Sequence, residues 1–198
     1  MLEHAPNAIG VDEAGRGPLA GPVVVAVVVL PDTFDLKGLN DSKKLSPAQR
    51  EAAEARIKTE AVWTIELAEP DEIDRRNILW ATMAAMERAV AGLPTGYDEV
   101  LIDGDRVPRG LVARGRAIVK GDGKIACIAA ASVLAKTHRD RLMRRMALLY
   151  PEYGFERNFG YPTPDHLKAL EIHGPCPIHR RSFAPIRRED QPCLIFGE

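Results

Sequence analysis

The sequence lacks the features of disulfide-stapled, membrane-spanning and secreted proteins. Its three cysteines, Cys127, Cys176 and Cys193, are an odd number and lie far apart, which excludes a disulfide framework and is typical of a reduced, cytoplasmic protein. The longest apolar run, residues 23–30, is far shorter than the roughly 20 residues of a membrane span. The first residues have neither the basic nor the apolar part of a secretory signal. We therefore expect a cytoplasmic protein that is not attached to a membrane.

Net charge is also nearly absent, at −1, so the overall composition gives no sign of a nucleic-acid partner. The balance differs between the two halves, however. Residues 1–100 carry 10 Lys and Arg against 17 Asp and Glu, whereas residues 101–198 carry 17 against 11. This asymmetry indicates a polyanionic partner. The densest basic stretch, residues 136–145, contains Asp140 as its only acid, and its alternative interpretation is a solvated helix face.

The chain of 198 residues, 45% of them hydrophobic, is long enough for a globular domain with a full core. Hydrophobic periodicity and turn residues predict strands over residues 9–12, 23–30, 62–67, 99–102 and 117–119, and helices over residues 46–58, 70–91, 124–150 and 162–173. We expect the first two strands to form a hairpin. The element order predicts an α/β fold, a mixed sheet flanked by helices, with a C-terminal helical extension.

A glycine-rich segment, residues 15–21, follows the first strand and could be taken for a dinucleotide-binding turn. Such a turn must open a helix whose N-terminus faces a pyrophosphate. Here Pro18 and Pro22 bracket the loop and a β-branched strand follows, and the chain has no Walker lysine pattern. The segment therefore predicts the turn of a hairpin rather than a nucleotide cofactor site.

Four acidic residues lie where solvated side chains are not expected. The first predicted strand ends in Asp12 and Glu13, and a later strand ends in Asp103. Asp140 falls on the apolar face of the long predicted helix. Because buried carboxylates are costly unless they are paired or bind a cation, the four predict a common site.

Each acid also has a structural alternative. Neighbouring strand residues point to opposite faces, so Asp12 and Glu13 share a site only if the chain twists at the glycine-rich turn, and otherwise they form a solvated strand end. Asp103 belongs to an Asp-Gly pair that is also a common turn. Asp140 can form a salt bridge with Lys136, one helical turn earlier.

A site made of carboxylate oxygens suits Mg²⁺ or Mn²⁺ far better than Zn²⁺. Two such ions about 4 Å apart activate a water and stabilise the leaving oxygen in phosphodiester hydrolysis. Basic side chains beside the acids would hold the phosphates. The candidates for this role are Lys43, Lys44, Lys120, Lys136 and Arg139.

Six segments in this order resemble the motifs of bacterial ribonuclease HII, a type 2 ribonuclease H. They are GVDEAGRGPLAGPVV (residues 10–24), LNDSKKLS (39–46), LIDGD (101–105), VKGDGKIACIAAASVLAKTHRD (119–140), GYPT (160–163) and GPCPIHRRSF (174–183). The resemblance covers residues 8–187. It implies a ribonuclease H-like catalytic domain over residues 1–150, a helical extension packed on it over residues 151–190, and a tail over residues 191–198.

The resemblance also implies a reaction. Members of the family cut RNA in duplexes with DNA and cut DNA duplexes on the 5′ side of an embedded ribonucleotide, which leaves a 3′-hydroxyl and a 5′-phosphate. Their catalytic metal ligands correspond here to Asp12, Glu13, Asp103 and Asp140. The resemblance implies two ions of Mg²⁺ or Mn²⁺ per site.

The family's substrate-binding residues can be transferred in the same way. The glycine-arginine-glycine turn, which reads the ribose 2′-hydroxyl through its backbone, corresponds to Gly15, Arg16 and Gly17. The tyrosine that stacks on the next sugar corresponds to Tyr161, for which core packing is the alternative. We expect Lys43, Lys44 and Lys136 to contact phosphates.

Two positions depart from the family's pattern. Phe159 stands where a lysine is frequent, which removes a phosphate contact, and Asp105 stands where an asparagine is frequent, which adds negative charge near the metals. Neither is among the four expected ligands, so we expect activity to be retained.

Two competing interpretations are weaker. A zinc site could be drawn from His166, His173, Cys176, His179 and Cys193, but their spacing matches no closed Cys and His pattern. A nucleic-acid-binding module without catalysis would need the basic residues but not the clustered acids, because uncompensated carboxylates repel phosphate.

The C-terminal residues 191–196, which begin at Gln191 and end at Phe196, read QPCLIF. They resemble the short motif with which bacterial replication and repair proteins bind the sliding clamp. A polar run, residues 187–191, separates them from the rest of the chain, and a short apolar peptide suits a pocket on a partner. The alternative is that they fold back onto the domain. We otherwise expect a monomer.

Overall fold

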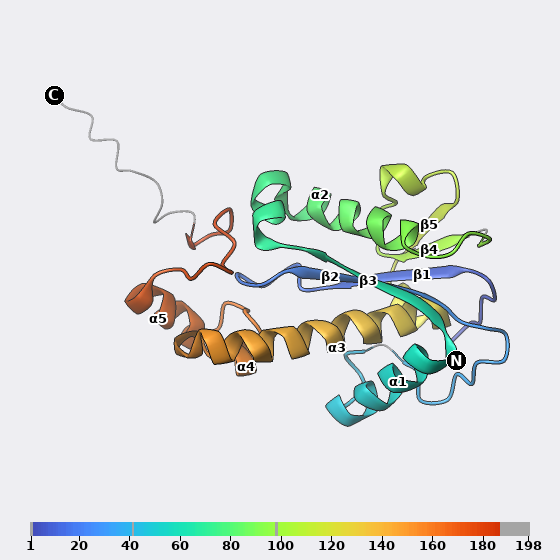
Figure 1. Cartoon of the computed structure of the whole chain (residues 1–198), viewed down its shortest axis with the longest axis horizontal. Helices are drawn as coiled ribbons and strands as arrows, with labels where there is room; N and C mark the ends of the chain where they lie inside the picture. The colour runs from blue at the N-terminus through green and yellow to red at the C-terminus, as the bar shows by residue number, and fades with distance from the viewer. Residues whose placement is uncertain (1, 41, 98, 187–198) are drawn as a thin grey trace.

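Within residues 2–40, 42–97 and 99–186, which the computed structural model describes, five strands form a mixed sheet with helices on both faces (Figure 1). The strands are β1 (Ile9–Ala14), β2 (Val23–Val29), β3 (Val62–Ala68), β4 (Val100–Asp103) and β5 (Gly115–Ile118). Their order is β3-β2-β1-β4-β5. β1 pairs antiparallel with β2, as the predicted hairpin requires, and parallel with β4. The predicted α/β class is confirmed.

Helices cover the sheet on both sides, and the connecting segments of the described residues contain three short 3-10 turns. The helices are α1 (Pro47–Glu60), α2 (Pro70–Ala91), α3 (Ala126–Leu149), α4 (Phe155–Asn158) and α5 (Pro164–His173), with η1 (Arg109–Leu111), η2 (Gly121–Gly123) and η3 (Pro151–Tyr153). α2 lies on one face of the sheet, and α1 and α3 lie on the other (Figure 1). None of the helices in the described residues is both long and apolar enough to cross a membrane.

β2 is buried on both faces, which explains its unbroken run of valines. Val24, Ala26 and Val28 pack in the cluster that contains α1 and α3. Val23 and Val25, which point the other way, pack in the cluster that contains α2. A strand covered by helices on both sides has no solvated face, so its sequence does not alternate.

β1 lies unusually close to α3. A Cβ at Gly10 would come within 2.2 Å of the main-chain carbon of Cys127. Glycine at this position therefore allows the two backbones to pack against each other, which brings residues from the middle of α3 to the end of β1.

The prediction of one uninterrupted helix over residues 70–91 is wrong in one respect. Asn77 has φ 62° and ψ 165°, which breaks α2 into two helical segments. Its side-chain oxygen accepts the N–H groups of Leu79 and Trp80 at 3.0 and 3.2 Å and so caps the second segment. The sequence pattern missed this break because the apolar spacing continues through it.

The residues after α3 pack against the end of that helix and against the turn between β1 and β2. Tyr153 and Phe155 share a hydrophobic cluster with Met143 from α3 and with Leu19 from the turn. The carboxylate of Asp74, on the first segment of α2, accepts hydrogen bonds from Ser182 and from the N–H of Arg181. The extension is therefore fastened to both sides of the sheet, while a domain boundary near residue 150 stays a prediction.

Candidate active site

Two acidic strand ends meet at the centre of the sheet. β1 and β4 run parallel with Val11 opposite Ile102, so the next residues, Asp12 and Asp103, lie side by side at the carboxyl ends of both strands. The chain continues from β1 to β2 on one side and from β4 to β5 on the other, and such a divergence leaves a crevice at the strand ends. Asp12, Glu13 and Asp103 line a cleft of about 490 Å³ at this place.

The turn after β1 brings Asp12 and Glu13 to the same cleft. Gly15 has φ 97°, a conformation that glycine adopts without strain. A Cβ at this position would also lie 2.0 Å from Nε of Arg139 on α3. The twist that two neighbouring acids need in order to share a site is therefore present, and it depends on this glycine.

The acids in the cleft repel one another. Burial raises the pKa of Asp12 well above its usual range, and the nearby charges of Glu13 and Asp103 raise it further, against the opposing hydrogen bonds from Ser132 and the Glu13 N–H. Burial also raises the pKa of Glu13, although Arg16, at 3.3 Å, favours its charged form. Positive charge in the cleft would lower the free energy of this arrangement.

These oxygen donors fit a hard divalent cation. Among the residues that the structure describes, no three His, Cys, Asp or Glu side chains are gathered closely enough to hold an ion on their own. Mg²⁺ is commonly held by one or two carboxylates together with waters and substrate phosphates, rather than by a cage of protein ligands. The open arrangement of Asp12, Glu13 and Asp103 along the cleft suits binding of that kind.

A further acid, which the sequence reasoning missed, is buried beside Asp103. The carboxylate of Asp103 accepts the N–H groups of Gly121 and Asp122 at 2.7 and 3.4 Å, so the η2 turn is attached to the end of β4. Asp122 itself is buried, with 8% exposure. Its position directly after β5, in the segment KGDG, was the signal in the sequence, because β5 ends next to β4.

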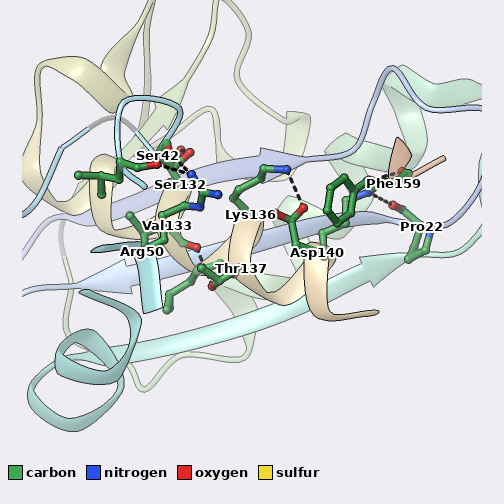
Figure 2. A network of polar contacts seen from close by, with 12 residues as sticks. Pro22, Ser42, Arg50, Ser132, Val133, Lys136, Thr137, Asp140 and Phe159 are labelled. Carbon is green, nitrogen blue, oxygen red and sulfur yellow. Dashed lines mark hydrogen bonds and ion pairs between the residues drawn. The ribbon is translucent and has the colours of Figure 1, made fainter. Parts of the chain in front are cut away.

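Asp140 is not among the residues that line the cleft with the other predicted ligands, and its role as a ligand stays a prediction. Its carboxylate accepts a hydrogen bond from Nζ of Lys136 at 2.6 Å, which is the salt bridge considered as its alternative (Figure 2). It lies two helical turns, about 12 Å, along α3 from Ser132, which hydrogen bonds to Asp12. Asp140 lines a separate hollow with Arg50.

The predicted phosphate-binding residues fall into two groups. Lys43 and Lys136 line the cleft with the acids, as does Arg16 of the predicted reading turn. Lys43 is positioned by its neighbour Ser42, whose buried hydroxyl is hydrogen bonded to that of Ser132 on α3 at 2.9 Å (Figure 2). Lys44 and Lys120 are exposed and are not among the residues that line the cleft.

The fifth candidate, Arg139, is almost completely buried and binds the protein's own backbone. Its guanidinium donates to the carbonyl oxygens of Ala20, Pro22 and Phe159 at 3.0 to 3.1 Å. Burial lowers the pKa of Arg139 to about 10, so the group stays charged at neutral pH. It therefore stabilises the turn between β1 and β2 rather than offering a free phosphate contact.

A second buried guanidinium, which the sequence analysis did not single out, holds the same turn from the other side. Arg180 donates to the carbonyl oxygens of Gly15, Arg16, Pro18 and Gly21. In a trans peptide the C=O and the following N–H point in opposite directions. The carbonyl groups of Gly15 and Arg16 point toward Arg180, so the N–H groups that follow them, those of Arg16 and Gly17, point away from it.

Tyr161 lies at the edge of the cleft and not in the core. Its side chain is 45% exposed, and a Cβ at Gly17 would lie 3.5 Å from its ring. Its carbonyl oxygen accepts a hydrogen bond from Nδ1 of His166 at 2.8 Å. The structure thus places the predicted stacking residue directly against the predicted reading turn.

Phe159, which stands where a lysine is frequent in the family, contacts two cationic side chains. Nζ of Lys136 lies 5.0 Å from the centre of its ring (Figure 2). The guanidinium of Arg144 lies 5.7 Å from the same point. Such cation–π contacts stabilise a charged side chain by about 0.5 to 2 kcal/mol. The other departure, Asp105, is exposed beside Arg106, and the carboxylate of Asp103 is turned toward η2.

Three of the residues considered for a zinc site, His166, Cys176 and His179, hydrogen bond to one another instead. Cys193 lies outside the residues that the structure describes. His179 accepts the N–H of Cys176 at Nδ1 and is 3.0 Å from His166 between their Nε2 atoms. Nδ1 of His166 donates to a carbonyl oxygen, so in a neutral ring its Nε2 is the acceptor. Nε2 of His179 then donates to Nε2 of His166, and this assignment leaves both rings neutral. Burial lowers the pKa of His179 to about 4, in agreement with a neutral ring.

Replacing Asp12 by Asn is expected to raise the free energy of unfolding at pH 7. The pKa of Asp12 is higher in the folded protein than the value of about 3.9 in an unfolded chain, so the folded state binds more protons and loses stability as the pH rises above about 4. Asn keeps the acceptor for the Glu13 N–H and removes the charge.

Urea unfolding over a pH series measures this effect. The advantage of Asp12→Asn should disappear below about pH 4, where Asp12 is protonated in both states. Glu156→Gln, at an exposed acid on α4, serves as the matched control and should change the stability by less than about 0.5 kcal/mol. Added Mg²⁺ should stabilise the wild-type protein more than Asp12→Asn. A variant less stable than the wild type at pH 7 would contradict the charge-repulsion argument.

Comparison with known proteins identifies the family of the chain. The family model described as Ribonuclease HII matches residues 9–186. A ribonuclease HII from Idiomarina loihiensis is 55% identical over 180 residues, which are 90% of this chain and 96% of the relative.

Solved structures show the same architecture. The ribonuclease H2 of Pyrococcus horikoshii superposes with a TM-score of 0.77 at 28% identity, over 91% of this chain and 95% of that one. A PCNA:RNase HII complex from Archaeoglobus fulgidus gives a TM-score of 0.75 at 28% identity, over 94% and 98% of the two chains. The ribonuclease H-like fold and the resemblance found in the sequence are confirmed. The chain belongs to the ribonuclease HII family, whose members are metal-dependent endoribonucleases of the RNase H type that act on RNA–DNA hybrids.

Proposed function

We propose that this chain, beyond cutting the RNA strand of RNA–DNA hybrids, cuts duplex DNA on the 5′ side of a single embedded ribonucleotide. The observation that supports this specificity is the turn fixed by Arg180, which lines the same cleft as the three acids. The N–H groups of Arg16 and Gly17 point away from Arg180. A site that hydrogen bonds a ribose hydroxyl discriminates strongly against deoxyribose, which leaves its polar groups unpaired.

The remaining residues of the cleft have separate tasks in this proposal. Lys43 and Lys136 bind the phosphates that flank the scissile bond, and Tyr161 stacks on the sugar that follows the ribonucleotide. When two Mg²⁺ or Mn²⁺ ions are bound, they supply an activated water and stabilise the leaving oxygen. Asp12, Glu13 and Asp103 would hold these ions, and their mutual repulsion favours cation binding.

We also propose that Asp122, rather than Asp140, supplies the fourth carboxylate. Asp122 is buried on the turn that hydrogen bonds to Asp103, whereas Asp140 is paired with Lys136. In this proposal Asp140 is a positioning residue that orients Lys136 toward the cleft.

A partner is proposed for the tail, which lies outside the described residues. The similar protein from Archaeoglobus fulgidus was solved as a complex with PCNA, which supports a sliding clamp as the partner, and the tail is the docking segment that we propose for it. Such a tether raises the local concentration of an enzyme that searches DNA for rare ribonucleotides. The monomeric state and the cytoplasmic location expected from the sequence remain part of this proposal.

The first test uses a DNA duplex with one ribonucleotide, incubated with Mg²⁺ or Mn²⁺. We expect a cut on the 5′ side of the ribonucleotide with 3′-hydroxyl and 5′-phosphate ends, and no cut when that ribose is replaced by deoxyribose. Asp103→Asn should lower the rate by more than about 100-fold and leave duplex binding intact, because it removes a metal ligand and reduces repulsion of phosphate. A 2′,3′-cyclic phosphate product would refute the mechanism.

The second test separates the two candidates for the fourth acid. Asp122→Asn should lower kcat by more than about 100-fold, as expected for a metal ligand, whereas Asp140→Asn should keep kcat within about 10-fold and raise KM, because Lys136 loses its orientation. The melting temperature of each variant shows whether it is folded. The reverse order of kcat values would return the role to Asp140.

The third test removes the tail, residues 191–198. If the tail is a tether, the truncated chain should lose clamp association in a pull-down with the clamp of its own cell, while cleavage of a short duplex and the melting temperature stay unchanged. A lower melting temperature, with no clamp binding by the full chain, would mean that the tail packs on the domain instead.

A further inference from the structure

A groove next to the active cleft has no role in the proposed reaction. Trp80, Leu79 and Met83 from α2 form its floor, and Arg106 and Arg109, from the segment after β4, form its wall around about 310 Å³. We call this the Trp80 groove. The Trp80 side chain is 44% exposed, which is unusual for the largest apolar side chain in a folded domain.

The Trp80 groove is continuous with the acid cleft. A hollow between them is lined by Glu13, Arg16 and Asp103 at one end and by Leu79, Met83 and Arg106 at the other. The first three residues also line the acid cleft, and the last three also line the Trp80 groove. A polymer bound at the acids can therefore extend along the surface to Trp80.

The tryptophan ring is held in place from two sides. The break in α2 at Asn77 fixes the main chain of Trp80 through the hydrogen bond to its N–H. The guanidinium of Arg109 lies 5.0 Å from the centre of the ring, and the η1 turn that carries it is attached to α2 by a 2.8 Å hydrogen bond from the N–H of Gly110 to Glu87. The ring is thus a preorganised flat surface.

The charge around the Trp80 groove favours an anion. Arg106 and Arg109 line it, and Arg76 extends the basic rim where the surface continues past Trp80. Arg76 lies 3.7 Å from Glu72 and Arg106 lies 4.0 Å from Asp105, so these two charges are partly balanced. Glu87 also lines this continuation, but its carboxylate already accepts the Gly110 N–H. An exposed aromatic ring with arginines along a groove matches sites where unpaired bases stack and phosphates follow the basic side chains.

We propose that the Trp80 groove binds single-stranded nucleic acid that continues from the duplex held at the acid cleft. A duplex hides the faces of its bases except at its ends, so a strand that passes along the groove can stack on Trp80 where its bases are unpaired. The inference rests on the proposed function, because it needs a nucleic acid in the cleft. It predicts that this chain prefers hybrids at junctions with single strands.

The test compares a blunt RNA–DNA hybrid with hybrids that carry about ten unpaired nucleotides at one end, a length typical of such sites. Each end and each strand is extended in turn. At least one extension should lower KM by about 5-fold or more for the wild-type chain, as expected for stacking of one base. Trp80→Ala should abolish this gain and keep kcat and KM on the blunt hybrid.

Three further variants sharpen the result. Trp80→Phe, which keeps an aromatic face, should retain most of the gain, and Leu148→Ala, at an 83% exposed position on α3, should retain all of it. Arg109→Gln should reduce the gain and make it less dependent on salt. The melting temperature of each variant shows that it is folded.

The outcomes separate the two proposals. If the wild-type chain cuts no hybrid, the proposed function fails. If it cuts the blunt hybrid but no extension changes KM, or if Trp80→Ala keeps the gain, the Trp80 groove does not bind single strands. A concentration-dependent dimer that Trp80→Ala abolishes would assign the groove to a second copy of the chain and would also overturn the inference.

Discussion

The geometry of the site depends on two arginines, Arg139 and Arg180, that are buried against main-chain carbonyl oxygens. A buried guanidinium is costly unless its donors are satisfied, and here the turn between β1 and β2 supplies the acceptors. Arg139 comes from α3 and Arg180 from the C-terminal extension, so the turn can take its shape only when both have packed. The extension therefore completes the cleft and is not an independent appendage.

The packing of the surrounding protein offsets the repulsion between the carboxylates in the cleft. Asp12 and Glu13 have raised pKa values because burial and neighbouring charges disfavour their ionised forms. β2, buried by helices on both of its faces, and the close packing of Gly10 on α3 provide stability next to these acids. Many enzymes share this arrangement, in which a strained or charged site is held by well-packed surroundings.

The parts of the fold that could be predicted are those whose signal is local. β2 and α3 were predicted because their apolar patterns extend over many residues, and Asp12 and Asp103 were found because strand ends are visible in the sequence. Residues whose importance comes from distant partners were not found. Arg180 binds carbonyl oxygens more than 150 positions earlier in the chain, and Asp122 lies beside Asp103 only because β4 and β5 are paired.

Asp140 has a partner that the sequence left open as an alternative. Its place on the buried face of α3 made it resemble the other acids, but the α3 residues that line the acid cleft are Ser132, Lys136 and Arg139, and Asp140 pairs with Lys136. Lys136 is bound on one side by Asp140 and on the other by the ring of Phe159. An acid and an aromatic ring thus contact one cation. In the proposed arrangement Asp140 and Phe159 both orient this lysine toward the substrate side, while a metal-ligand role of Asp140 stays a prediction.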